Sequence, residues 1–442
     1  MASASTTNMD MNLARLFLDN HSFSSSDLGI PKLKLSGDSI FSDQDLLTLI
    51  LVRVPLKKLT QFKCVSKSWL FLISSPFFSN LRCCMLPLPP RFGLFFQSSL
   101  IGNRLGRLQK DQVYCFPVQD GYNDDHDNKA PVFNHDLFGH RGHRTRILDS
   151  SHGLLLCASY FWTPQIEREH YIYNPTTNEL ATLPRPSHQS LICSLSMVLA
   201  FRSSDSPHYK IIACAKIPQE TPRDVPNSFL IMQFEIYSSE TRSWRVCGQP
   251  FVSLSFFKFT QGVYCNGSVY YPNALQSEEE ESAESSDCLY FNLEDERLHT
   301  FPTPPIATTR SLRRSFYFGE SDDHLHFVEV CPYAAVLHVH EMNCDHSGWF
   351  VKYLVDLAPL CKTFPQCGDE YLVAVLSIVR RDKFQEDDSF LVLGTCDEVV
   401  SYNLVNRSLK KMFDLEEVFD QASMLRHKNL KAWQYVEGNL SV

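Results

Sequence analysis

The sequence predicts a mainly β fold with a small N-terminal helical module. From about residue 86 onward, short runs of β-branched and aromatic residues alternate with turn residues, and few windows could hold a helix of three turns. Between residues 42 and 78, apolar residues instead form longer stretches bounded by capping residues and prolines, a pattern typical of helices. The hydrophobic content of 44% and the aromatic content of 12% suit a folded, β-rich chain.

The β-rich part carries a weak internal repeat. Each unit is a strand rich in Tyr, Phe or Val that ends in a polar turn, followed by a short strand that leads to an apolar residue, a Leu-Pro or a Trp. Spacings of roughly 50 to 65 residues are those of four-stranded blades with variable loops. We therefore expect a β-propeller-like domain over residues 86–430, in which residues 86–118 could complete or add a blade. Five units are visible, and they begin at Tyr171, Phe234, Leu289, Leu337 and Val399.

Charge and composition exclude several classes of protein. The chain has 50 acidic and 41 basic side chains, a formal net charge of −9, and no basic stripe of the kind that binds nucleic acid. No run approaches the roughly 20 apolar residues that a membrane span needs. The 15 cysteines are scattered behind an N-terminus without a secretory signal, so we expect reduced thiols and a cytoplasmic and/or nuclear protein.

The sequence contains no recognisable metal-binding or catalytic motif. His324 and His326, like His338 and His340, each place two imidazoles on one strand face, but a third ligand at a recognisable spacing is absent, so we expect solvent-facing residues and no metal. Neither a Gly-x-Ser-x-Gly elbow nor a phosphate-binding glycine loop occurs. We expect no catalytic residues, no cofactor and no enzyme activity.

The N-terminal part divides into a leader and the helical module. Residues 1–40 are rich in Ser, Asp and Asn without sustained periodicity, so we expect a disordered leader. The helical module spans 41–84: one helix runs from a cap at Ser42 to Pro55, and a second stretch, Leu56–Ile73, is interrupted near residues 62–65. Residues 431–442 are expected to be a tail.

This module has more apolar surface than it can bury alone. Its first helix leaves only Thr48 and Arg53 polar between residues 46 and 54, and five successive apolar residues, 69–73, point all around the second. About 40 residues are too few to cover that surface. Either the β domain or a separate protein must therefore pack on it, because leaving several such side chains in water costs several kcal/mol at about 25 cal/mol per Å².

The helical segment resembles the F-box of the large plant F-box families. The run from Phe62 to Trp69 is its specific part, because it matches residue type and spacing over eight positions. Two departures stand out: Phe41-Ser42 replaces the usual Leu-Pro, and Leu49 replaces the usual Glu. The other matching residues are Asp45-Leu46-Leu47, Ile50-Leu51, Arg53-Val54-Pro55, Leu56-Lys57-Lys58-Leu59, Leu72-Ile73 and Pro76-Phe77-Phe78.

The resemblance implies an F-box three-helix unit that docks on an SKP-family adaptor and, through it, on cullin and RING subunits. Catalysis of ubiquitin transfer belongs to those partners. The adaptor-facing and core positions that the resemblance implies are Leu46, Leu47, Ile50, Leu51, Val54, Pro55, Leu56, Leu59, Phe62, Cys64, Val65, Trp69 and Ile73.

The rest of the chain is similar, more loosely, to the F-box-associated domains of the same families. The matches include residues 151–157, 173–177 and 262–267. Without the family, these segments have a structural meaning: Asn266-Gly267 between two strand patterns is the preferred two-residue hairpin turn.

The function that this resemblance implies is substrate recognition in an SCF-type E3 ubiquitin ligase, with an unidentified protein client on the β domain. Two alternatives stay open. One is a ligase-independent binding protein with a degenerate F-box, suggested by the departures at Phe41, Ser42 and Leu49, and adaptor pull-down separates it from the ligase reading. The other is a propeller enzyme or sugar-binding module, which activity or glycan binding by residues 86–442 alone would reveal.

Overall fold

The computed structural model divides the chain into two compact units, one of which contains the helices before residue 75 and the other most of the strands with the short helix Ala358–Thr363. The predicted leader, residues 1–40, lies outside the residues that the structure describes. These are 44–54, 56–75, 77–78, 81, 92–98, 113–118, 132–133, 144–160, 167–186, 196–202, 206, 208–217, 229–254, 259, 262–272, 288–305, 315–330, 335–363, 373–380, 389–395, 398–415 and 430–436.

The helical module contains three short helices: α3 (Gln44–Val52), α4 (Leu56–Phe62) and α5 (Lys67–Ile73). The predicted interruption lies between α4 and α5, where the amide of Val65 donates to the carbonyl of Phe62 at 3.1 Å in a tightened final turn. Ser66 then caps α5, since its hydroxyl accepts the amide of Trp69 at 3.2 Å. The predicted cap at Ser42 and the stop at Pro55 lie outside the described residues.

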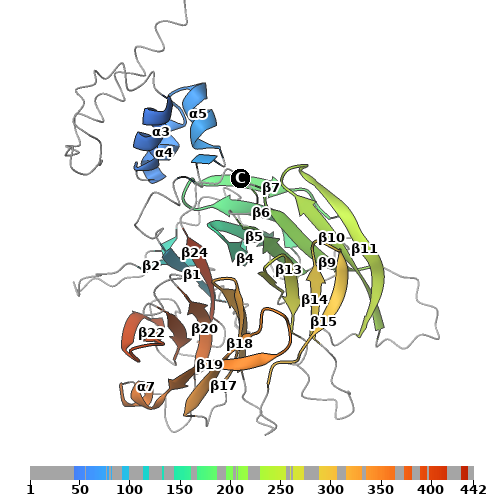
Figure 1. Ribbon diagram of the computed structural model, residues 1–442, viewed down its shortest axis with the longest axis vertical. Helices are drawn as coiled ribbons and strands as arrows, with labels where there is room; N and C mark the ends of the chain where they lie inside the picture. The colour runs from blue at the N-terminus through green and yellow to red at the C-terminus, as the bar shows by residue number, and fades with distance from the viewer. Residues whose placement is uncertain are drawn as a thin grey trace, which may run out of the picture. The chain divides into compact units, whose positions relative to one another are not determined.

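The strands form six four-stranded antiparallel sheets, seen around a common centre in Figure 1. A short helix, α7 (Ala358–Thr363), lies between β19 and β20. The strands are β1 (Phe92–Ser98), β2 (Val113–Val118), β3 (Val132–Phe133), β4 (Arg144–Ser151), β5 (Leu154–Tyr160), β6 (Glu167–Asn174), β7 (Glu179–Leu183), β8 (Ser196–Ala200), β9 (Lys210–Lys216), β10 (Phe229–Ser238), β11 (Ser243–Leu254), β12 (Val263–Cys265), β13 (Ser268–Tyr271), β14 (Cys288–Asn292), β15 (Arg297–Phe301), β16 (Ser315–Ser321), β17 (His324–Val330), β18 (Val336–Met342), β19 (Trp349–Asp356), β20 (Ala374–Val379), β21 (Phe390–Gly394), β22 (Glu398–Asn403), β23 (Leu409–Asp414) and β24 (Leu430–Val436).

The six sheets close into a ring, so the predicted β-propeller is confirmed. Blade 1 is β24 with β1–β3, and blades 2 to 6 are β4–β7, β8–β11, β12–β15, β16–β19 and β20–β23. The first strands of neighbouring blades contact one another in the order β4, β8, β12, β16, β20, β24 and back to β4, so these six strands border the axis. We call the end where the first strands begin the loop end, and the end where they turn into the second strands the turn end.

The C-terminal strand completes the first blade. β24 pairs antiparallel with β1, from Phe92 opposite Val436 to Ser98 opposite Leu430. The prediction of a tail at 431–442 is therefore wrong for residues 431–436, because blade 1 takes its first strand from the far end of the chain. The five repeat units lie in blades 2 to 6, and blade 1 takes β1 and β2 from the segment 86–118 that was expected to complete or add a blade.

Tight turns join the strands at the turn end. His152-Gly153, Asn266-Gly267 and Asp322-Asp323 all have positive φ at both residues, from 44° to 87°, as a two-residue hairpin requires. The predicted hairpin at Asn266-Gly267 is confirmed, since Cys265 pairs with Ser268. Between third and fourth strands, the side-chain oxygen of Asn292 accepts two amides at 2.8 and 3.1 Å, and that of Asn403 does the same at 2.9 and 2.8 Å.

The repeat units end either in a Pro or in a Trp, and these two residue types meet between neighbouring blades. The indole N–H of Trp349 in blade 5 donates to the carbonyl of Pro302, just after β15 of blade 4, at 2.9 Å. Trp244 in blade 3 donates in the same way to Pro184, just after β7 of blade 2, at 2.6 Å. A unit that ends in Pro and the following unit that carries Trp are thus joined by a hydrogen bond between blades.

Candidate functional site: the helical module and the axis of the propeller

The helical module has a core of its own. The apolar face of α3 packs with residues of α4, α5 and Phe78 in one cluster of buried side chains. Phe62 and Trp69 close this cluster edge to face, with ring centroids 5.6 Å apart. Arg53, one of the polar residues of the first helical stretch, donates from its guanidinium to the carbonyl of Leu49 at 2.8 Å.

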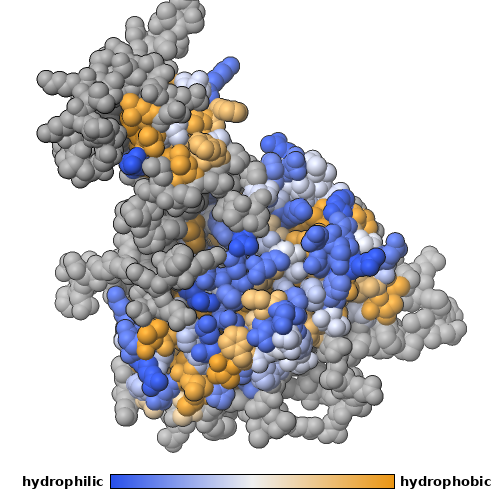
Figure 2. Space-filling view, viewed as in Figure 1, coloured by the Kyte–Doolittle hydropathy of each residue, from blue (hydrophilic) through white to orange (hydrophobic). Residues whose placement is uncertain are grey.

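Apolar side chains also lie on the surface of this module. Phe71 is 79% exposed, Phe77 66% and Leu70 46%, and orange apolar surface is visible on the module in Figure 2. On α5, Leu72 and Ile73 turn inward while Leu70 and Phe71 turn outward. The run of five apolar residues at 69–73 was the signal for this surface, but a run that covers every side of a helix does not tell which members are exposed.

The residues implied as adaptor-facing or core divide by burial. Phe62, Trp69, Leu46, Ile50 and Val65 are partly exposed, and Cys64 is exposed. Pro55 and the side chain of Leu56 lie outside the described part of the chain. The buried members, all in the core cluster, are Leu47, Leu51, Val54, Leu59 and Ile73.

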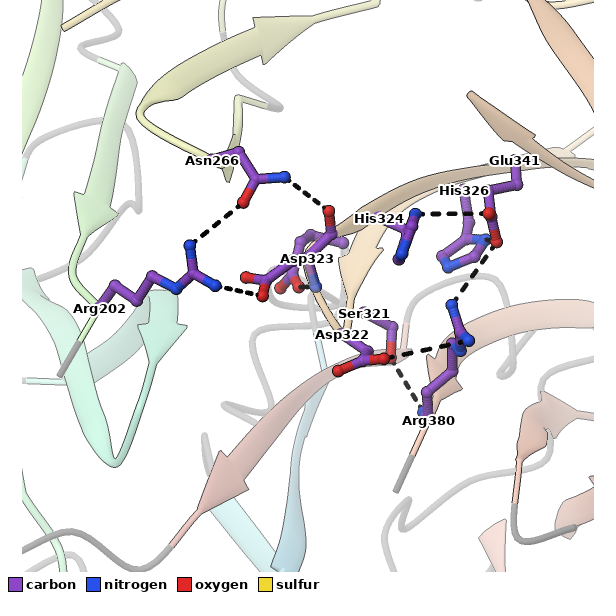
Figure 3. Close-up of polar contacts among 10 residues, drawn as sticks. Arg202, Asn266, Ser321, Asp322, Asp323, His324, His326, Glu341 and Arg380 are labelled. Atoms are coloured by element: carbon purple, nitrogen blue, oxygen red, sulfur yellow. Dashed lines mark hydrogen bonds and ion pairs between the residues drawn. The ribbon is translucent and has the colours of Figure 1, made fainter. Parts of the chain in front are cut away.

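In the propeller, polar side chains from three successive blades meet at the turn end (Figure 3). The guanidinium of Arg202, just after β8, binds the carboxylate of Asp323 and donates to the amide oxygen of Asn266 at 3.4 Å. The amide of Asn266 in turn donates to the carbonyl of Asp323 at 2.8 Å. Blades 3, 4 and 5 are therefore bonded together through their first turns.

A second group joins blades 5 and 6. The carboxylate of Glu341 lies 3.3 Å from His324 Nδ1 and 3.6 Å from Arg380 Nη1, and the amide of Arg380 donates to the Ser321 hydroxyl at 2.9 Å (Figure 3). Burial lowers the pKa of His326 to about 3, so this imidazole is neutral. Within the described residues, no group of three or more His, Cys, Asp or Glu side chains is arranged to hold a metal ion.

The expectation that the paired histidines face solvent is wrong for His326 and His340. His326 has no exposed surface and His340 is 8% exposed. The physical reason is that both faces of a propeller blade are covered by neighbouring blades, so alternation along a strand does not separate inside from outside. Both imidazoles are therefore enclosed within the propeller.

Two carboxyl groups near the axis have raised pKa values. Asp149 on β4 accepts the amides of Leu199 and Ser150 at 2.8 Å each, and burial still raises its pKa to about 7. Glu320 accepts the amide of Asp323 at 2.7 Å, and burial, with the charges of Asp322 and Asp323, raises its pKa to about 7. Asp149 thereby joins blade 2 to blade 3, whereas the bond of Glu320 lies within the first turn of blade 5.

Burial affects the thiols that lie inside the propeller. Burial raises the pKa of Cys157 and that of Cys247 to about 12, which keeps both protonated. No helix in the described part of the chain has the length and apolar character that crossing a membrane requires. The described side chains thus offer apolar surface and ion pairs that could serve binding.

Comparison with known proteins identifies a family and several relatives to which this chain is similar. Residues 128–339 match the F-box associated beta propeller domain family. F-box protein At5g07610 of Arabidopsis thaliana is 30% identical over 406 residues, which cover 88% of this chain and 89% of that protein. F-box protein At5g03970 of the same plant is 26% identical, covering 54% of this chain and 53% of that protein, and F-box only protein 8 is 33% identical, covering 34% and 44%.

The similarity to the first of these relatives extends over 88% of this chain. It therefore includes residues of both parts of the molecule, the short helices before residue 82 and the six-bladed ring after it. The resemblance to plant F-box proteins with an F-box-associated domain is thereby confirmed at the level of the family. The chain belongs to the plant F-box proteins that carry an F-box-associated propeller domain.

Proposed function

We propose that this chain is the substrate-recognition subunit of an SCF-type E3 ubiquitin ligase. The helical module docks on an SKP-family adaptor, which links it to cullin and RING subunits, and the propeller holds a protein client for ubiquitination. The observation that carries the proposal is the exposed apolar surface of Leu70, Phe71 and Phe77 on a module whose own core is already filled. Membership of the F-box family supports the proposal.

The exposed side chains are suited to a protein interface in both kind and amount. Large aromatic side chains supply much of the binding energy of interfaces, because each removes a large apolar area from water. Covering one such side chain is worth about 1.5 to 3 kcal/mol. The partly exposed Leu46 and Ile50 on α3 extend the set of side chains that a partner could cover.

In this role the chain does not itself catalyse the formation of a covalent bond. It holds the client beside the ubiquitin-loaded enzyme, so that attack by a client lysine becomes effectively intramolecular. The cytoplasm, the nucleus or both are the compartments in which we expect it to act.

The experiment that tests the proposal is co-purification of the full chain with a co-expressed SKP-family adaptor. We expect the wild-type chain to retain the adaptor and the double variant Leu70→Ser, Phe71→Ser to retain at least tenfold less, because two side chains of the interface lose most of their apolar area. A second double variant, Leu46→Ser with Ile50→Ser, tests the partly exposed positions of α3. Leu51 is unsuitable for this purpose, since it is 1% exposed and its substitution tests folding instead of docking.

The matched control is Val252→Ser on β11 of the propeller, which removes a side chain that is 63% exposed. It should leave adaptor retention unchanged. If the wild-type chain fails to retain any SKP-family adaptor, the ligase assignment is wrong and a ligase-independent binding protein takes its place. If both double variants retain the adaptor fully, the docking surface is misplaced.

A further inference from the structure

The outer edge of blade 5 carries exposed apolar side chains on two neighbouring strands. β19 is the last strand of its sheet, and it pairs with β18. Leu354 on β19 is 58% exposed, and three further apolar side chains on these two strands are 40% to 47% exposed. These three are Val336, Phe350 and Val351. Apolar side chains that gather on an edge strand favour pairing with a further strand.

The two faces of this edge differ. Leu337 and Val355, which lie opposite each other, are buried in a cluster with residues of blade 6. On the other face, Leu354 lies opposite His338, which is also exposed, and Val336 is the next residue of β18 on that face. Leu354 is therefore the centre of an exposed face and not part of the blade core.

The outer strands of the other blades are shorter or carry residues that oppose edge pairing. Natural edge strands avoid pairing by being short, by carrying Lys or by carrying Pro. β3 has two residues, and β7 and β15 have five each. β11 contains Pro250, and β23 contains the exposed Lys410 and Lys411. β19 has eight residues with two charges, Lys352 and Asp356, and beyond a bulge its residues 353–356 keep a regular register with β18.

The two charges make β19 complementary to itself. Lys352 and Asp356 lie two positions to either side of Leu354, so all three belong to one face of the strand. When two copies pair antiparallel with Leu354 opposite Leu354, each copy places its Lys352 opposite the Asp356 of the other. A shift of one position in either direction instead places a charge opposite Leu354, and a centre at Lys352 places two lysines opposite each other. The charges thus favour one register between two copies.

Both charged residues also interact within their own chain. One carboxylate oxygen of Asp356 accepts the amide of Ala358 at 2.9 Å, and the carboxylate has a second oxygen. Lys352 has an interaction within the chain too, and an ammonium group offers three N–H donors. The pairing between copies therefore adds to these contacts and does not require either residue to be free.

We propose that β19 pairs antiparallel with β19 of a second copy of this chain, about a two-fold axis at Leu354. The pairing joins two copies of blade 5 into one continuous sheet, because alternate residues of a terminal strand direct their N–H and C=O groups away from the sheet. It also covers Leu354 of each copy with that of the other. One strand and a few side chains make a small interface, so the dimer depends on protein concentration. The dimer does not rest on the function proposed above.

The test is sedimentation of the full chain over a roughly hundredfold range of protein concentration, since a dimer forms by mass action. We expect the wild-type chain to approach twice the mass of a single chain at the upper end of the range. Leu354→Lys and Leu354→Glu should each stay monomeric, because each places two like charges opposite one another at the two-fold axis. An equal mixture of these two variants should form a mixed dimer, in which a lysine faces a glutamate.

The mixture guards against a folding artefact, because a variant that has not folded cannot pair with the other. Leu354→Ser is a further, uncharged variant and should weaken the association about tenfold, since both copies lose apolar area at the axis. The matched control is Lys410→Glu on β23, which changes the charge at an exposed position on the outer strand of blade 6. This control should associate as strongly as the wild-type chain.

Each result either supports or overturns the proposal. A wild-type chain that stays monomeric at every concentration overturns the pairing with a second copy and leaves the edge to a strand of another protein. Dimers of Leu354→Lys alone or of Leu354→Glu alone, or undiminished association of Leu354→Ser, overturn this interface. A mixture of the two charged variants, each folded by thermal unfolding, that stays monomeric overturns the register centred on Leu354.

Discussion

At the scale of single residues, Asp149 links the stability of the ring to pH. Its carboxyl group joins β4 to β8 through the amide of Leu199, and its folded pKa of about 7 lies above the ordinary value of 3.8. The folded state therefore favours the protonated form. The stabilisation is complete below about pH 4 and is lost as the pH rises through 7, at most about 4 kcal/mol for a shift of this size.

We predict that Asp149→Asn removes this part of the pH dependence. The difference in melting temperature between wild type and variant should become less favourable to wild type as the pH rises from 4.5 to 8, measured by thermal unfolding in buffers of constant ionic strength. Glu240→Gln, at an exposed turn position, serves as the control and should show a constant difference. A pH-independent difference for Asp149→Asn would mean that this carboxyl has the same pKa in the folded and unfolded states.

At the scale of elements, local sequence patterns predicted strands and turns better than they predicted which side chains are buried. Asn266-Gly267 was recognisable as a hairpin because Gly tolerates positive φ, whereas Asp322-Asp323 adopts the same turn without a glycine. The break between α4 and α5 was visible in the pattern. Burial at His326 and the choice of Leu70 and Phe71 as surface residues depend on which elements pack together, and this information is not local.

The link between repeat units leads to a prediction at this scale. Trp349→Phe keeps most of the apolar ring but removes the N–H that donates to Pro302, leaving a partly buried carbonyl without that bond. We expect a loss of about 1 to 2 kcal/mol in the free energy of unfolding, measured by urea denaturation. Trp244→Phe makes the same change at an exposed bond to Pro184, where water replaces the donor, and should cost less. Equal costs would show that these bonds do not stabilise the junctions through burial.

At the scale of the whole molecule, ring closure joins the two ends of the propeller sequence. Leu430 and Ala432 pack with Leu94, Phe96 and residues of blade 6, while the opposite face of β24 places Tyr435 against blade 2. The side-chain amide of Gln434 also donates to the backbone carbonyl of Ile378 in blade 6, and the backbone carbonyl of Gln434 accepts the Ser150 hydroxyl at 2.8 Å. Seven residues thus close a ring of six blades. A sequence read blade by blade cannot reveal such a strand, because its partners are more than 300 positions away.

Removal of the closing strand should therefore be far more damaging than its length suggests. We predict that deleting residues 430–442 abolishes the cooperative unfolding transition of the propeller and makes it sensitive to brief proteolysis, because blades 1, 2 and 6 each lose a packed neighbour. Deleting only 437–442, beyond the last strand residue, should leave the melting temperature within about 1 °C of wild type. Because both deletions start from the same C-terminus, the contrast isolates β24 from any general effect of shortening the chain. A sharp transition at the wild-type temperature after removal of 430–442 would show that five blades and three strands are stable without closure.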